Sequence, residues 1–141
     1  MPIENKTYTI TDLSGEFDIS LRTIRFYEEK ELIRPERTES SQRIYSSRDR
    51  ARLKLILRGK RLGFSLTQIA EMIGMASVNM NERDQIQKSI AYGQKKLEEV
   101  KQMKEELFLL EEDLLALYKK LADRLFELDQ MSNGQKEPDI N

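Results

Sequence analysis

The side chains in this sequence that are best suited to chemistry are arginines, and most of them gather in one stretch. Residues 20–61 hold 13 basic and 6 acidic residues, and ten of the basic residues are Arg. A guanidinium group forms bidentate hydrogen bonds with a phosphate or a base edge, whereas an ammonium group acts as a point charge. The stretch therefore favours contact with nucleic acid, although a basic face that meets only water would have the same composition.

The composition excludes most enzymatic chemistry. The 141 residues include no His and no Cys. The chain therefore lacks an imidazole base, a thiol nucleophile and the ligands of a Cys/His zinc site. Its Ser, Lys and carboxylate residues form no recognisable catalytic constellation. We expect a protein that is not an enzyme and that uses no metal or cofactor.

Charge and hydropathy give a coarse organisation. Residues 1–75 hold 14 basic and 11 acidic residues, whereas residues 76–141 hold 10 basic and 14 acidic residues. No apolar run reaches the roughly 18 residues that a membrane span needs, and the start of the chain does not resemble a signal peptide. We expect a cytoplasmic protein with a basic domain at 1–75 and an acidic segment after it.

Two short helices would position the first arginines. The apolar spacing predicts a helix within residues 8–17, which Thr11 can cap, and a second helix that begins after Ser20. The second helix carries Arg22 and Arg25 near its start. Two helices around so tight a turn are typical of a helix-turn-helix.

The rest of the basic domain is predicted as a wing and two more helices. The polar stretch 34–47 ends on β-prone residues and indicates a hairpin. Ser46 begins a capping box for a third helix that ends at Gly63, and Ser65 caps a fourth helix that Gly74 ends. The predicted fold is mainly α, a winged helix-turn-helix followed by a long helix.

Residues 81–130 contain no proline and predict one continuous helix of roughly 70 Å. Apolar residues recur there at the two core positions of a heptad repeat, which predicts a coiled-coil homodimer. These residues are Val100, Met103, Leu107, Leu110, Leu114, Leu117, Leu121 and Leu128. An intramolecular helix hairpin is the alternative. The segment 76–130 would thus be a linker and dimerisation helix, and residues 131–141 a disordered tail.

Four motifs in register resemble the MerR (mercury-resistance regulator) family of bacterial transcription factors. They are TITDL, SLRTIRFYEEKELI, the stretch from Arg37-Thr38 through RIYS, and RLKLILRGKRLGFSL, and they cover Tyr8 to about Ile73. The resemblance implies a winged helix-turn-helix DNA-binding domain and a long dimerisation helix, often antiparallel to its partner. It also implies binding to double-stranded promoter DNA near RNA polymerase.

The resemblance also assigns DNA-contacting residues to this chain. They are Ser20, Leu21, Arg22, Thr23, Arg25, Phe26, Tyr27, Arg43, Tyr45 and Lys60. Structural alternatives remain for several of them. Tyr27 and Tyr45 could be core aromatics, Lys60 could contact only water, and Arg25 could pair with Glu28 or Glu29.

Three turn positions depart from the family pattern. Asp18 and Glu31 stand where glycine is frequent, and Ser41-Gln42 replaces Gly-Tyr before Arg43 in the wing. A non-glycine residue at Glu31 in the left-handed region would cost about 1 kcal/mol, whereas Asp tolerates that region better. The Tyr contact of the wing is lost.

These features predict a dimeric regulator that binds an inverted-repeat promoter site and distorts it. The nearest branch is that of the LiuR-like regulators, which implies control of branched-chain amino acid or acyl-CoA catabolism. The absence of Cys leaves an organic effector or none, bound along the long helix near Phe108, Tyr118 and Phe126. Two alternatives are an excisionase-like protein that bends DNA without an effector, and a coiled-coil adaptor that binds protein.

Overall fold

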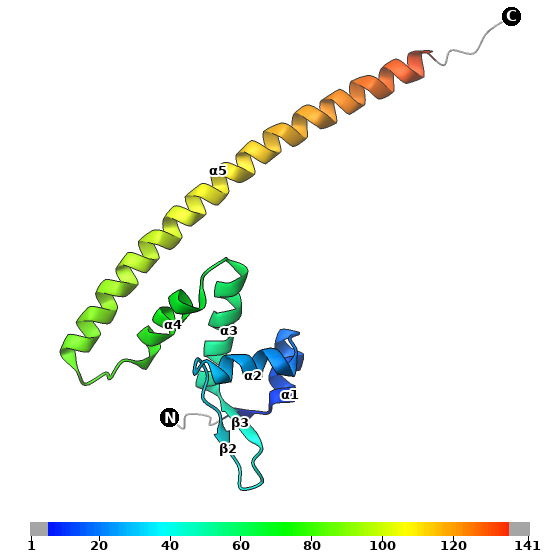
Figure 1. The fold of residues 1–141 in the computed structure, drawn as a ribbon. Helices are drawn as coiled ribbons and strands as arrows, with labels where there is room; N and C mark the ends of the chain where they lie inside the picture. The colour runs from blue at the N-terminus through cyan, green and yellow to red at the C-terminus, as the bar shows by residue number, and fades with distance from the viewer. Residues whose placement is uncertain (1–5, 136–141) are drawn as a thin grey trace, which may run out of the picture. The chain divides into compact units, whose positions relative to one another are not determined.

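The computed structural model describes residues 6–135, which fall into two compact units that meet between Ser89 and Ile90. Each unit is considered by itself. The first contains strand β1 (Thr7–Tyr8), helices α1 (Ile10–Phe17) and α2 (Leu21–Glu29), strands β2 (Glu36–Arg37) and β3 (Arg43–Ser46), helices α3 (Ser47–Arg61) and α4 (Leu66–Gly74), and the 3-10 helix η1 (Met75–Ser77) (Figure 1). The last helix, α5 (Arg83–Gln135), begins in the first unit and continues through the second.

Side-chain caps fix where the helices of the first unit begin. The predicted caps Ser20, Ser46 and Ser65 are confirmed, and each accepts a hydrogen bond from the backbone amide three residues later. The prediction of Thr11 is wrong, because Thr9 caps α1. Thr9 forms a capping box with Asp12, at 3.0 Å and 2.9 Å, and only Thr9 has a carboxylate three residues further on.

The wing is confirmed as an antiparallel pair of β2 and β3, with Glu36 opposite Ile44. The sheet has a third strand that the sequence did not predict. Strand β1 pairs with the other edge of β3, with Tyr8 opposite Tyr45, so β3 is central in the order β1-β3-β2. Two residues are too few to show the alternation by which a strand is recognised.

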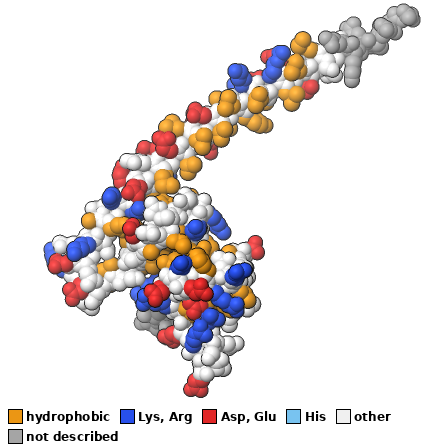
Figure 2. All heavy atoms as spheres, in the orientation of Figure 1, with side chains coloured by type: hydrophobic (Ala, Val, Ile, Leu, Met, Phe, Trp, Pro, Cys, Tyr) orange, Lys and Arg blue, Asp and Glu red, His pale blue; other side chains and the backbone are white. Residues whose placement is uncertain are grey.

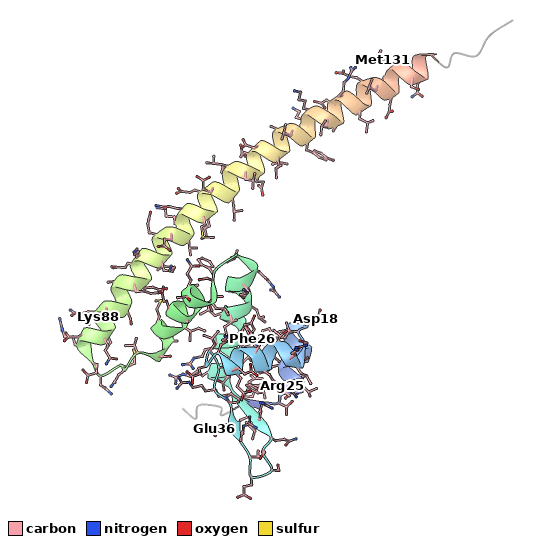
Figure 3. The ribbon with its side chains drawn as sticks, in the orientation of Figure 1. Asp18, Arg25, Phe26, Glu36, Lys88 and Met131 are labelled. Atoms are coloured by element: carbon pink, nitrogen blue, oxygen red, sulfur yellow. The ribbon has the colours of Figure 1, made fainter. Side chains whose placement is uncertain are left out.

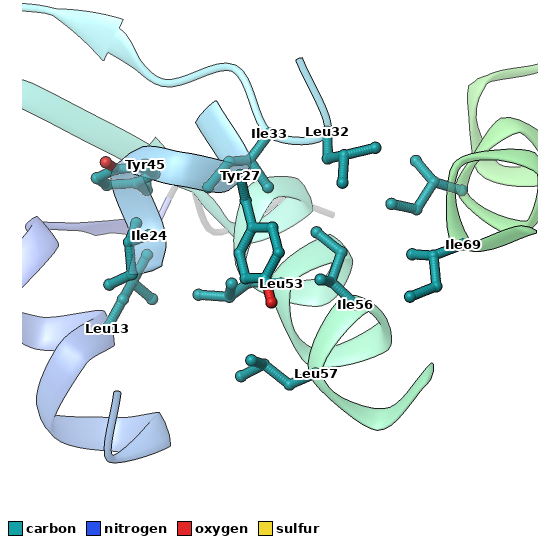
Figure 4. Packing of buried hydrophobic residues seen from close by; sticks show 11 residues of the cluster. Leu13, Ile24, Tyr27, Leu32, Ile33, Tyr45, Leu53, Ile56, Leu57 and Ile69 are labelled. Atoms are coloured by element: carbon teal, nitrogen blue, oxygen red, sulfur yellow. The ribbon is translucent and has the colours of Figure 1, made fainter. Parts of the chain in front are cut away.

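One apolar cluster joins all four helices of the first unit to β3 (Figure 4). Helix α2 contributes Ile24 and Tyr27, which are one turn apart on its inner face. The full set is Leu13, Ile24, Tyr27, Leu32, Ile33, Tyr45, Leu53, Ile56, Leu57, Ile69 and Ile73. Because two of its residues are buried there, α2 has one fixed face toward the core and one toward solvent.

The expected left-handed turns are present. Asp18 ends α1 with φ 53°, and Glu31 follows the cap of α2 with φ 60°. Ser41, at the tip of the wing, has φ 64°. The positive φ at Glu31 confirms that this chain places a non-glycine residue in a conformation that favours glycine.

Helix α5 is longer than predicted. It begins at Arg83 and continues to Gln135, five residues beyond the predicted end at Gln130, so the prediction of a disordered tail is wrong for 131–135. Residues 136–141 of that predicted tail lie outside the described residues.

Large apolar side chains are exposed along α5 (Figure 2). Within the described part of the chain, no helix has the length and apolar content needed to cross a bilayer.

The packing of α3 on α4 predicts how a methyl group added at Gly59 changes the stability of the fold. A Cβ at Gly59, which is buried, would lie 2.8 Å from Cγ1 of Ile69 on α4. We expect Gly59→Ala to lower the free energy of unfolding by about 1–3 kcal/mol through overpacking, measured by urea denaturation. Gly15→Ala is the control, because a Cβ at Gly15 meets no atom within 4 Å. It should raise stability by about 0.5–1 kcal/mol, since alanine favours a helix. Equal effects at the two positions would contradict this packing.

Candidate nucleic-acid interface

The first turn of α2 is capped and exposed, as a recognition element requires. The hydroxyl of Ser20 accepts a hydrogen bond from the amide of Thr23 at 3.1 Å, and the two hydroxyl groups are 2.9 Å apart. Leu21 and Arg22 follow the cap and are exposed. The first turn of a helix presents free backbone amides and partial positive charge, which suits contact with phosphate.

The same outer face continues into the second turn of α2. Arg25 and Phe26 are exposed there, between the buried Ile24 and Tyr27 (Figure 3). The ammonium group of Lys30 lies 5.6 Å from the centre of the Phe26 ring. Arg25 makes no ion pair with any described residue, so its guanidinium is not used to brace Glu28 or Glu29.

Glu28 joins α2 to the wing. Its carboxylate accepts a hydrogen bond from Nε of Arg43 at 2.6 Å and lies 3.6 Å from a terminal nitrogen of Arg37. Arg43 and Arg37 stand opposite each other on β3 and β2, so one carboxylate on α2 contacts both wing strands. Arg43 is therefore held between the helix and the wing.

The two tyrosines on the predicted contact list lie in the core. Tyr45 is fully buried, and its hydroxyl has no hydrogen-bond partner among the described residues. Burial, reinforced by the nearby Glu28 carboxylate, raises the pKa of Tyr45 to about 12. Tyr27 is also buried, and its burial raises the pKa of its hydroxyl. The structure thus favours a packing role for both, and a DNA contact by either stays a prediction.

A second basic surface lies on α3. Lys60 is exposed, but it comes two residues after Arg58 and one before Arg61, so it is on a different side of the helix from the residues of this surface. Lys54, Arg58 and Arg61 line a shallow cavity of about 250 Å³ beside Glu16 and Phe17 of α1. Sequence reasoning missed these three cations, although their spacing of four and three residues was a sufficient signal that they share a face.

Glu16 does not cancel the charge of that surface. Both of its carboxylate oxygens accept from Nε of Arg50 at 2.9 Å. This hydrogen bond lowers the pKa of Glu16, which therefore stays ionised and paired with Arg50. The basic residues Lys54, Arg58 and Arg61 remain available to a phosphate backbone.

Comparison with known proteins identifies the family of this chain. A family model described as the MerR HTH family regulatory protein matches residues 8–75, and a model described as MerR, DNA binding, matches residues 50–117. The HTH-type transcriptional regulator ZntR of Escherichia coli K12 is 34% identical over 112 residues, which cover 78% of this chain and 77% of ZntR. The chain belongs to the MerR family.

Other MerR-family proteins support the same fold. A mercuric resistance operon regulatory protein of Bacillus cereus is 39% identical over 69 residues, which cover 48% of this chain and 52% of that protein. A crystal structure of HiNmlR, a MerR-family regulator lacking the sensor domain and bound to promoter DNA, matches with a TM-score of 0.56 and 26% identity over 72% of this chain and 76% of the other. This MerR-family chain is a DNA-binding transcription regulator.

The contact between helix and wing gives a stability prediction. Glu28→Gln removes the charge that pairs with Arg43, a pair in which both side chains are mostly buried. We expect the free energy of unfolding to fall by about 1 kcal/mol, measured by urea denaturation. Glu29→Gln is the control, because Glu29 is exposed, and it should change stability by less than about 0.5 kcal/mol. A loss of equal size in both variants would show that Glu28 does not hold the wing.

The burial of Tyr45 gives a pH prediction. Its pKa in the folded protein, about 12, exceeds the usual value of 10, so ionisation favours the unfolded chain. Stability should fall as the pH rises from 10 toward 12, measured by denaturation across that range. Tyr45→Phe should remove part of this alkaline loss and leave stability at neutral pH unchanged or higher, because the lost hydroxyl has no partner. Tyr118→Phe is the control, because Tyr118 is exposed, and it should leave the alkaline loss unchanged. A large loss of DNA affinity in Tyr45→Phe would instead support a contact by its hydroxyl.

Proposed function

We propose that this MerR-family chain binds an inverted-repeat promoter site as a homodimer and regulates transcription by distorting the DNA. The observation that carries the proposal is the exposed, capped start of α2 with Arg22 and Arg25 on its outer face. The promoter-bound structure of HiNmlR, whose fold this chain shares, supports DNA as the ligand. Two recognition helices related by two-fold symmetry would read the two half-sites.

The proposed contacts divide by position. Residues 20–23 and Arg25 approach the base edges of the major groove, and Phe26 packs beside them. Arg43 in the wing and Lys60 on α3 contact the sugar-phosphate backbone, together with the basic surface of Lys54, Arg58 and Arg61. Backbone contacts of this kind position the protein and make binding depend on salt, whereas base contacts select the sequence.

The proposed dimer follows from the exposed heptad seam of α5. Leu107, Leu114 and Leu121 recur at one heptad position, and more than half of each side chain is exposed. A single helix cannot bury such a stripe, and the heptad spacing suits a second helix. A second copy of the chain provides the same spacing, and a two-fold axis that relates the two copies matches the symmetry of an inverted repeat.

The proposal extends to regulation in the cytoplasm, next to RNA polymerase. Control of branched-chain amino acid or acyl-CoA catabolism is supported only by the sequence resemblance to LiuR-like regulators. An organic effector would bind along α5, where Phe108, Tyr118 and Phe126 are exposed beside the heptad seam. The chain has no Cys or His to coordinate a soft metal ion.

The test is a fluorescence anisotropy titration of the full chain against a labelled fragment of its own upstream region and an unrelated fragment, across a salt series. We expect tighter binding to the upstream fragment and a steep loss of affinity with salt. Arg22→Ala should weaken binding to the upstream fragment by about ten- to a hundredfold. Arg124→Ala, on α5, is the control and should bind as the wild type does. Equal affinity for both fragments would indicate an architectural DNA-bending protein, and no binding would indicate an adaptor.

The dimer is tested in the same experiment. Leu114→Glu places a charge in the seam and should shift the chain from dimer to monomer in sedimentation equilibrium, with a matching loss of DNA affinity. Glu112→Gln, which is outside the heptad core positions, should leave both properties unchanged. A Leu114→Glu protein that remains dimeric would rule out this seam as the interface.

A further inference from the structure

A larger basic cavity lies within the first unit, lined by the C-terminal ends of α2 and α4, the start of α3 and η1. Its volume is about 660 Å³. The polar side chains that line it include Lys30, Arg34, Arg48, Arg52, Ser46 and Ser77. Against these four cations stand two lining carboxylates, those of Glu31 and Asp49. The cavity therefore has an excess of positive charge.

The one buried carboxylate of this cavity, that of Asp49, makes no ion pair with a guanidinium group of the described residues. Asp49 accepts hydrogen bonds from the backbone amide of Arg34 at 3.0 Å, from the amide of Ser46 at 3.0 Å and from the Ser46 hydroxyl at 3.1 Å. Its oxygens are thus used by backbone and hydroxyl donors. Arg34, Arg48 and Arg52 form no ion pair with any described residue.

Arg52 lacks an acceptor for one of its donors. A terminal nitrogen of Arg52 donates to the hydroxyl of Ser77 at 2.6 Å, but its buried Nε has no partner within the described chain. Burial, together with the nearby charges of Arg48 and Arg34, lowers the pKa of the Arg52 guanidinium, although the Asp49 carboxylate opposes this shift. A buried donor without a partner costs free energy, and the side chain that carries it lines the cavity.

The helix ends around the cavity do not supply that acceptor. The carbonyls of Phe26 and Glu28 accept hydrogen bonds from the amide of Lys30. The carbonyl of Ile73 accepts from the Ser77 hydroxyl at 3.5 Å. The last carbonyls of α2 and α4 are therefore partly satisfied, which reduces the repulsion that they would exert on an anion.

We propose that this cavity binds a phosphate group, held by the guanidinium groups of Arg48 and Arg52 with support from Arg34 and the Ser77 hydroxyl. A phosphate offers several acceptor oxygens and up to two negative charges, which match clustered guanidinium donors. The phosphate would come either from the DNA backbone or from a small soluble phosphorylated molecule. The site is separate from the outer face of α2, so it does not depend on the proposed function.

Occupancy of this site would stabilise the segment that leads into α5. Arg52 is on α3, whereas Ser77 is the last residue of η1, and η1 comes between α4 and α5 in the chain. An anion bound by Arg48 and Arg52 would reinforce the link between α3 and η1. The expected signs are a higher melting temperature with phosphate and slower amide hydrogen exchange in residues 73–80.

The test is isothermal titration calorimetry of the full chain with inorganic phosphate at pH 8, at constant ionic strength set with chloride. The wild type should show saturable binding, and Arg48→Gln, which removes an exposed charge, should weaken that binding at least tenfold. Arg52→Gln should do the same; because Arg52 is partly buried, the proposal is decided by Arg48→Gln if Arg52→Gln fails to fold. Arg124→Gln is the control, because it removes an exposed guanidinium charge outside this cavity. No saturable binding, or an equal loss in Arg124→Gln and Arg48→Gln, would overturn the proposal.

DNA titrations identify the source of the phosphate. If the cavity takes a phosphate of the DNA backbone, Arg48→Gln should weaken DNA binding in phosphate-free buffer, reduce the salt slope by about 1, and make inorganic phosphate a weaker competitor of DNA. If the cavity takes a soluble phosphate, Arg48→Gln should leave DNA affinity in phosphate-free buffer unchanged while calorimetric binding is lost. Calorimetry contains no DNA, so failure of the DNA-binding proposal would not affect its result.

Discussion

The arrangement of the DNA-binding unit depends on the buried carboxylate of Asp49. It receives the amide of Arg34, just before the wing, and both donors of Ser46, at the end of the central strand. Because Asp49 is itself in the first turn of α3, one side chain joins the segment after the recognition helix, the wing and the third helix. An ionised carboxylate is stable inside a protein only when such donors surround it. Its hydrogen bonds therefore fix the geometry within which the arginines of α2, β3 and α3 are presented.

Much of the first unit could be predicted from local sequence signals, because helix caps and heptads act over three to seven residues. Ser20, Ser46 and Ser65 were found in this way. The choice between Thr9 and Thr11 failed because two residues of the same type compete, and only the position of Asp12 decides. Strand β1 and the contact of Glu28 with Arg43 join residues far apart in the chain, so they cannot be predicted from local residue spacing. The burial of Tyr45 has the same origin, since it depends on β3 being the central strand.

The basic residues of this protein differ in whether they are paired with a carboxylate. Arg50 is paired with Glu16, and Arg43 is shared with the recognition helix through Glu28. Arg22, Arg25 and the basic face of α3 have no such partners among the described residues. A count of basic residues cannot make this distinction, because it treats a guanidinium that fastens two elements together like one that is available to a ligand. Arg34, Arg48 and Arg52, which line the cavity next to Asp49, likewise form no ion pair with any described residue.

The left-handed turns at Asp18 and Glu31 restrict the orientational freedom of the recognition helix. Asp18 is in the turn that leads into α2, and Glu31 is in the turn that follows it. Glycine would adopt the same backbone angles with less strain, but it would also populate many others. Non-glycine residues at these two positions cost a small backbone strain energy, and they narrow the range of orientations that α2 can adopt. In the proposed dimer, two copies of α2 must fit one stretch of duplex, and this restriction lowers the conformational entropy that is lost on binding.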